Sequence, residues 1–337
     1  MPLFTPPLDT RIGSYRLTNQ LVGVTVENGA YRVSLTKVEK YLRFCIGLGF
    51  EYFEFSHLFS QWGAKCAPQV AAKVNGKTQR IFGWDNASDD PKYIELLGIV
   101  LPKLVKLTKK LGIFEKSMIH ISDEPSEASI ETYKKLRNIV KPLVAGMPVC
   151  DAASDLGYAE IVDIPFVAIS EVHKFIDAHA ENFGAYYCCG PIGGYYTNRF
   201  ISFPQTRIRV LGTMLYLSGA KGFLHWGYNF YHSALSVYSL NPFDSADGGK
   251  HYPAGDPFIV YPDFKNNGAL PSIRLIAMNQ AMDDYRMLEA LEQKTSRAYV
   301  VSLIGKAGVK GFNQYPHDDS WLPEFFEKVK AEIMDAK

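Results

Sequence analysis

The chain has 337 residues, of which 47% are hydrophobic and 21% are charged, as expected of a soluble globular protein with a large core. Its 36 lysines and arginines balance 35 aspartates and glutamates, which leaves no strongly basic surface for nucleic acid or an anionic membrane. No apolar run approaches the length of a membrane span, and the first residues lack the pattern of a secretory signal. We therefore expect a cytoplasmic protein with neither a nucleic-acid partner nor a membrane partner.

Cofactor and metal motifs are not found in the sequence. The five cysteines are odd in number and show no Cys-x-x-Cys spacing, and the histidines include no His-Glu-x-x-His motif. The glycine-rich stretch 190–198 lacks the Gly-Lys-Ser/Thr ending of a phosphate-binding loop. We expect no disulfide framework, no metal and no cofactor.

The predicted elements alternate between strand and helix over most of the chain. After a proline-rich strap or linker at 1–19, the strand 20–26, the helix 35–48 and the strand 51–56 predict a first βαβ step. An Asn75-Gly76 pair within 70–82 predicts a small hairpin. Further strands are expected at 118–121, 148–151, 164–169 and 222–228, and further helices at 91–111, 126–140, 171–182, 199–218 and 272–291.

This alternation predicts a (β/α)8 TIM barrel over 20–291 with long decorating loops. The stretch 229–271 is rich in glycine, proline, aspartate and asparagine, and loops of this length are usually functional. We expect 292–337 to form a C-terminal extension whose amphipathic last helix packs on the barrel.

The most informative stretch is 118–125, a short apolar strand that runs directly into Asp123 and Glu124 and is stopped by Pro125. Barrel enzymes place their reacting groups at the carboxyl ends of strands, with a helix following almost at once. An acidic pair before a helix also fits a simple helix start, with Ser126 as the N-cap. The apolar strand favours the catalytic interpretation, because such a strand has little other reason to end in two carboxylates.

Several stretches together resemble the catalytic domain of glycoside hydrolase family 123 and the related domain-of-unknown-function 4091 proteins. The resemblance covers about 20–291. Its motifs are Ile121-Ser122-Asp123-Glu124-Pro125, Ser56-His57-Leu58-Phe59-Ser60-Gln61-Trp62-Gly63-Ala64-Lys65, Gly222-Phe223-Leu224-His225-Trp226-Gly227-Tyr228-Asn229 and Pro271-Ser272-Ile273-Arg274-Leu275.

The resemblance implies a β-N-acetylgalactosaminidase on a (β/α)8 barrel, in which the 2-acetamido oxygen of the sugar attacks the anomeric carbon. By motif, Glu124 corresponds to the general acid/base, and Asp123 corresponds to the residue that orients and stabilises the acetamido group. The family usually carries a β-sandwich before the barrel, and this chain begins too late to contain one. We therefore expect the barrel without that sandwich.

The chemistry of adjacent carboxylates supports the same mechanism. In conventional glycosidases two carboxyl groups flank the scissile bond, and adjacent residues cannot easily straddle a sugar. They can act from one side if the substrate supplies its own nucleophile, and Glu124 then needs a pKa raised by the charge of Asp123. The substrate-binding residues are expected at loops and strand ends: His57, Trp62, Lys65, Asp151, Tyr187, Asn198, Trp226, Tyr228, Asn229 and Arg274.

Two alternatives remain open at this stage. One is a conventional double-displacement glycosidase whose nucleophile is Asp151 or Glu54, each at a neighbouring predicted strand end. The other is a non-catalytic carbohydrate-binding barrel. For each aromatic candidate, packing in the core is the alternative to sugar binding.

Overall fold

The computed structural model describes residues 1–6, 8–125, 127–158 and 160–335, and shows a mixed α/β fold. Ser126, the predicted N-cap, lies outside the described residues. The chain divides into two compact units, Met1–Pro165 and Phe166–Lys337, and each is described by itself. Within the described ranges, no helix combines the length and apolarity needed to cross a membrane.

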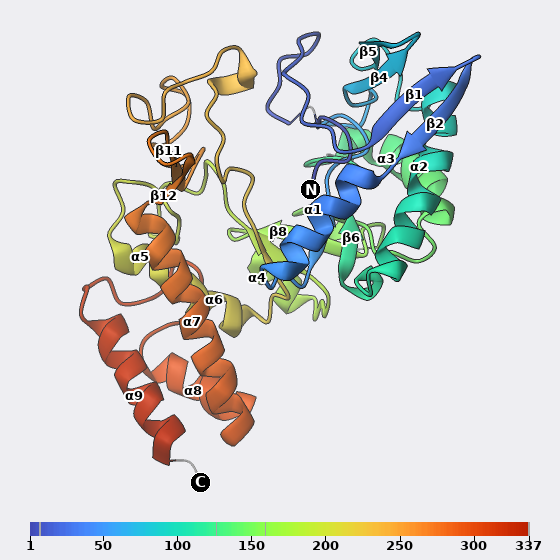
Figure 1. The fold of residues 1–337 in the computed structure, drawn as a ribbon. Helices are drawn as coiled ribbons and strands as arrows, with labels where there is room; N and C mark the ends of the chain where they lie inside the picture. The colour runs from blue at the N-terminus through green and yellow to red at the C-terminus, as the bar shows by residue number, and fades with distance from the viewer. Residues whose placement is uncertain (7, 126, 159, 336–337) are drawn as a thin grey trace. The chain divides into compact units, whose positions relative to one another are not determined.

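The first unit contains a four-stranded sheet in the order β2-β1-β4-β5 (Figure 1). Its strands are β1 (Gly23–Glu27), β2 (Ala30–Ser34), β4 (Val70–Val74) and β5 (Lys77–Phe82). Asn28 and Gly29 have positive φ angles of 52° and 80°, so the chain reverses there and β2 pairs antiparallel with β1. The predicted first βαβ step is therefore wrong, since β1 belongs to this mixed sheet. The hairpin predicted at Asn75-Gly76 is confirmed.

A parallel pair of strands precedes the candidate loops of the first unit. β3 (Phe53–Phe55) pairs in parallel with β6 (Ser117–Ile119). A parallel pair needs a crossover, and α2 (Pro91–Lys110) lies in it, as the sequence predicts. Asp90 caps α2 by accepting a 2.9 Å hydrogen bond from the Lys92 amide. The remaining elements of this unit are α1 (Thr36–Gly47), α3 (Ile130–Val140) and β7 (Cys150–Ala152).

The second unit contains three parallel neighbours, β8 (Ile164–Ala168), β9 (Gly184–Tyr186) and β10 (Phe223–Leu224). The short helix α4 (Val172–Asp177) lies between β8 and β9 in the chain. β8 begins in the first unit, where the Ile164 amide donates to the Val149 carbonyl at 3.0 Å. The sheets described here do not close into the predicted eight-stranded barrel, so the structure confirms the mixed α/β class but not the closed barrel.

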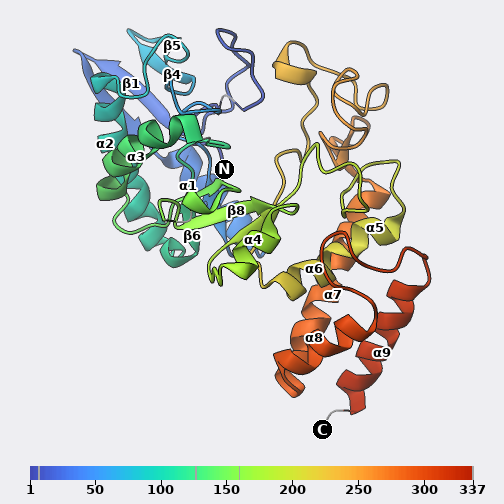
Figure 2. The same cartoon turned by 180° about the vertical axis from the view of Figure 1, so that it is seen from behind.

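Helices dominate the rest of the second unit, and α7 lies beside the others (Figures 1 and 2). They are α5 (Gln205–Arg209), α6 (Leu211–Ser218), α7 (Ile273–Lys294), α8 (Arg297–Lys306) and α9 (Trp321–Asp335). The helix predicted at 199–218 is divided between α5 and α6, and α8 was not predicted. The long predicted loop 229–271 contains the hairpin of β11 (Val260–Asp263) and β12 (Gly268–Pro271).

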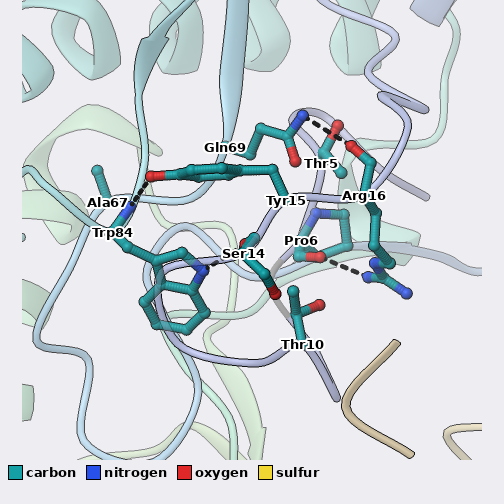
Figure 3. Close-up of a pocket in the computed structure, with 9 residues that line it drawn as sticks. All are labelled: Thr5, Pro6, Thr10, Ser14, Tyr15, Arg16, Ala67, Gln69 and Trp84. Carbon is teal, nitrogen blue, oxygen red and sulfur yellow. Dashed lines mark hydrogen bonds between the residues drawn. The ribbon is translucent and has the colours of Figure 1, made fainter. Parts of the chain in front are cut away.

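The N-terminal strap is held against the first unit by side-chain hydrogen bonds to backbone groups (Figure 3). Trp84 Nε1 donates to the Ser14 carbonyl at 2.9 Å, and Gln69 Nε2 donates to the Arg16 carbonyl at 2.9 Å. The cavity enclosed there measures about 10 Å³, which is close to the space that one water occupies. This cavity is therefore part of the packing of the strap and is too small for a sugar.

Candidate active site

Asp123 and Glu124 follow β6 and are joined by backbone hydrogen bonds to the loop that follows β3. The Phe59 amide donates to the Ile121 carbonyl at 3.0 Å, and the Trp62 amide donates to the Asp123 carbonyl at 3.2 Å. Glu124 and Trp62 both have positive φ angles, of 42° and 55°. Non-glycine residues rarely adopt this conformation, and such strain is concentrated at functional sites. The two predicted loops therefore meet at residues with uncommon backbone conformations.

Asp151, from β7, is fully buried and holds the strand end that precedes the acidic pair. Its carboxylate accepts hydrogen bonds from the amides of Ile121 (3.2 Å) and Ser122 (3.3 Å), and from the hydroxyl of Tyr133. It also lies 2.9 Å from Nδ1 of His120. A buried carboxylate needs several such partners to offset its desolvation, and here those partners are the peptide groups that lead to Asp123.

His120 is buried between two carboxylates, with Nδ1 2.9 Å from Asp151 and Nε2 2.8 Å from Glu54. Burial opposes its protonation, but neighbouring Cys150, Glu54 and Asp151 outweigh burial and raise the pKa of His120 well above its usual value. His57 lies against this ring at a centroid distance of 4.4 Å. Burial and the charge of His120 hold the pKa of His57 well below its usual range. The pKa values of the two imidazoles are therefore shifted in opposite directions.

Burial raises the carboxyl pKa values of both Asp151 and Asp123. Desolvation and then the charge of Glu124 raise the pKa of Asp123 to about 7, while the positive charge of His120 opposes the rise. The sequence argument required a raised pKa at Glu124, so the structure adds a titrating group that this argument did not identify. Neighbouring carboxylates with different environments are typical of acid/base sites.

A metal fits this cluster poorly. Ligand-type atoms of His57, His120 and Asp151 lie within 4.8 Å of one another, and His57 Nδ1 has no hydrogen-bond partner in the part of the chain that is described. However, Nδ1 of His120 and the Asp151 carboxylate are 2.9 Å apart, whereas two ligands of a tetrahedral zinc are separated by roughly 3.3 Å. Their spacing is that of a hydrogen bond.

The predicted binding residues of the first unit differ in accessibility. Trp62 is 51% exposed and Lys65 is exposed, so both can meet a ligand directly. His57 is 8% exposed and Asp151 is fully buried. In this conformation, Asp151 acts on the site through the backbone that it holds, and its predicted contact with substrate stays a prediction.

The predicted binding residues of the second unit include exposed residues, buried residues and the half-buried Trp226. Tyr228 and Asn229 are exposed. Tyr187, Asn198 and Arg274 are buried. Arg274 donates to the carbonyls of Gly255, Phe258 and Arg199, and Asn198 donates to the Cys188 carbonyl at 3.0 Å. These two side chains therefore brace loops, and their predicted roles in binding a sugar remain predictions.

Asp256 is a residue of the second unit that the sequence analysis missed. It is fully buried and accepts hydrogen bonds from Trp226 Nε1 (2.8 Å) and Cys189 Sγ (3.3 Å), and it lies 3.2 Å from His225 Nε2. Burial raises its pKa, but His225, Trp226 and Arg199 outweigh burial and lower it. Asp256 therefore fixes the indole of Trp226. No local signal identified it, because it lies in the aperiodic stretch 229–271.

Comparison with known proteins supports the assignment that the motifs suggested. The model of the glycoside hydrolase 123 catalytic domain matches residues 1–291. No curated protein matches the chain.

Two solved structures were compared with the fold. A family 123 glycoside hydrolase from Clostridium perfringens, studied for glycolipid glycan hydrolysis, superposes with a TM-score of 0.64 at 15% identity. The alignment covers 98% of this chain and 60% of that one, and at this identity it shows a shared fold alone. A β-D-glucuronidase from Dictyoglomus thermophilum gives a TM-score of 0.39 at 10% identity, with 81% and 55% of the two chains covered. The family match over most of the sequence shows that this chain belongs to glycoside hydrolase family 123.

Proposed function

We propose that the protein is a retaining exo-β-N-acetylhexosaminidase that favours β-N-acetylgalactosaminides and acts by substrate-assisted catalysis. The observation that carries the proposal is the pair Asp123 and Glu124 at one strand end, where a buried hydrogen-bond network holds the preceding peptides. The proposed catalytic domain is a barrel over 20–291.

In the proposed mechanism, Glu124 protonates the leaving oxygen and later activates water. Asp123 aims the acetamido oxygen at the anomeric carbon and supports the positive charge of the oxazolinium. Adjacent carboxylates suit this division because both approach the sugar from one side, whereas two-carboxylate mechanisms need groups about 5 Å apart or more that flank the bond. His120 supplies positive charge near Asp123 and so favours its ionised form.

The proposal is tested by assaying aryl β-N-acetylgalactosaminide and aryl β-N-acetylglucosaminide side by side. We expect turnover of both or of the galacto sugar alone, with the higher kcat/KM for the galacto sugar. A chelator should leave that activity unchanged, because the proposed chemistry uses no metal. If neither glycoside is hydrolysed, the proposal is wrong.

A conventional double-displacement mechanism is the second candidate, and the structure favours Glu54 over Asp151 as its nucleophile. Asp151 is fully buried and bonded to peptide groups. The side chain of Glu54 is 40% exposed. Burial raises the pKa of Glu54, but the charge and hydrogen bond of His120 outweigh burial and lower it to about 2, so this carboxylate is ionised. A glycosyl-enzyme trapped on Glu54 would favour this mechanism.

The third possibility is a carbohydrate-binding protein without hydrolytic activity. It would bind the glycan without cleaving it, and Glu124→Gln would leave that binding unchanged. Calorimetric titration of both forms with the same glycan separates this possibility from the proposed enzyme.

A further inference from the structure

An open pocket of about 530 Å³ lies in the second unit, beside the hairpin of β11 and β12. Tyr261 and Leu270 are cross-strand partners in that hairpin and both line the pocket. Phe243, from the preceding loop, lines it as well, and its ring lies 5.2 Å from that of Tyr261 at an angle of 35°. The pocket volume is within the range of about 300–1,000 Å³ that is usual for small-molecule sites.

The walls of the pocket are held in place without a ligand. Tyr261 packs edge-on against buried Phe258, with 5.2 Å between the ring centroids. The loop carrying Phe243 is a tight turn, because Asn241 Oδ1 accepts from the Phe243 amide at 3.2 Å and Asn241 Nδ2 donates to Asp244 at 2.7 Å. A preformed site loses less conformational entropy when it binds a ligand.

The chemistry of the lining selects one class of ligand. Phe243 is 54% exposed, so a large part of its surface is available to a partner. Asp244 and the hydroxyls of Ser245 and Ser272 add polar groups, and among the described residues no lysine, arginine or histidine lines the pocket. An aromatic surface next to a carboxylate fits a molecule with one apolar face and several hydroxyl groups. The carboxylate disfavours phosphorylated, sulfated or carboxylated ligands.

We propose that this pocket is a binding site for a neutral sugar. The apolar face of the sugar packs on Phe243 and Tyr261, and its hydroxyl groups donate to Asp244. This inference rests on the family assignment, by which the protein acts on carbohydrate, and does not depend on a preference for N-acetylgalactosamine.

The binding test uses the full chain carrying Glu124→Gln and saturation-transfer NMR with lactose as a neutral disaccharide probe. We expect saturation transfer to lactose, lost with Phe243→Ala and reduced with Asp244→Asn. Phe264→Ala is the matched control, because Phe264 is 78% exposed and its ring lies 6.4 Å from Phe243, but it does not line the pocket. Absence of transfer, equal loss in the control, or displacement of lactose by hexanol would overturn the proposal.

A kinetic test separates this site from the proposed catalytic chemistry. In the otherwise unchanged enzyme, Phe243→Ala should leave both kcat and KM for the aryl glycoside unchanged. A loss of roughly tenfold or more in kcat/KM for the aryl glycoside would contradict a sugar site that is separate from the catalytic chemistry. If the aryl glycoside is never hydrolysed, the proposed function fails, while the NMR result still decides whether the pocket binds sugar.

Discussion

Asp123 and Glu124 are adjacent in the chain, yet their replacement should have different kinetic consequences. An activated aryl glycoside hardly needs an acid for its first step, so Glu124→Ala should lose much less activity on it than on a natural glycan. Asp123→Ala should lose roughly 10²-fold or more on both, since the acetamido oxygen is no longer supported as charge develops. The measurement is kcat/KM of both variants on both substrates. The reverse pattern would show that the two roles are exchanged.

The pH dependence of activity should report the ionisation of Asp123. The pKa of Asp123 is about 7, so kcat/KM should fall as the pH falls through about 7 and this carboxylate becomes protonated. The charge of His120 lowers that pKa, and His120→Gln should therefore move the acidic limb to higher pH, by about one unit. Tyr133→Phe is the control, because it removes a hydrogen bond to Asp151 without removing a positive charge. If the acidic limb lies at the same pH in His120→Gln and in the unmodified enzyme, His120 does not lower the pKa of Asp123.

The same carboxyl group should also make stability depend on pH. Its pKa is raised from 3.8 to about 7 in the folded protein, so its contribution is fully present below pH 3.8 and is lost as the pH rises through about 7. Asp123→Asn should therefore be more stable than the unmodified protein at pH 8, by on the order of 2 kcal/mol, and show no such gain at pH 3.5. Urea denaturation at both pH values measures the difference. A gain of equal size at both values would mean that ionisation is not its cause.

At the scale of elements, the sequence predicts best where one local signal determines the structure. The helix predicted at 91–111 forms as α2, and the Asn75-Gly76 turn forms its hairpin. The helix predicted at 199–218 was placed too early at its start, because periodicity does not show where a helix begins: α5 begins only after Pro204. Pairing partners were predicted less well, since β1 pairs with β2 and β4 through contacts that no local pattern specifies.

The packing of α6 on α7 gives a test at this scale. A Cβ atom added at Gly212 would lie 1.8 Å from the Ala281 carbonyl oxygen, so Gly212→Ala must push the helices apart. We expect a loss of roughly 1–3 kcal/mol or more. Gly98 in α2 has open space at its Cβ position, so Gly98→Ala should stabilise the protein by up to about 1 kcal/mol. Urea denaturation midpoints compare the two. If Gly212→Ala is no less stable than Gly98→Ala, α6 and α7 do not approach each other as closely at Gly212 as the structure shows.

For the whole molecule, the sequence predicted the family and the mixed α/β class. The motifs that indicated the family included both loops, 56–65 and 121–125. The buried groups that hold the candidate residues were harder to predict. Asp151 was predicted as a substrate-binding residue but not as the residue that holds these peptide groups, and Asp256 was not identified at all. Each carboxylate has partners far away in sequence, such as Tyr133 for Asp151 and Trp226 for Asp256. Long-range partners of this kind depend on the fold and leave no spacing in the sequence.

The central claim is that the acetamido oxygen of the substrate is the nucleophile. A series of aryl N-acetylgalactosaminides with zero, one, two or three fluorine atoms on the acetyl methyl group tests it directly, because each fluorine makes that oxygen a poorer nucleophile. We expect kcat/KM to fall steeply along the series, by on the order of tenfold or more for each fluorine. A flat series would contradict the account and would favour a nucleophile supplied by the protein.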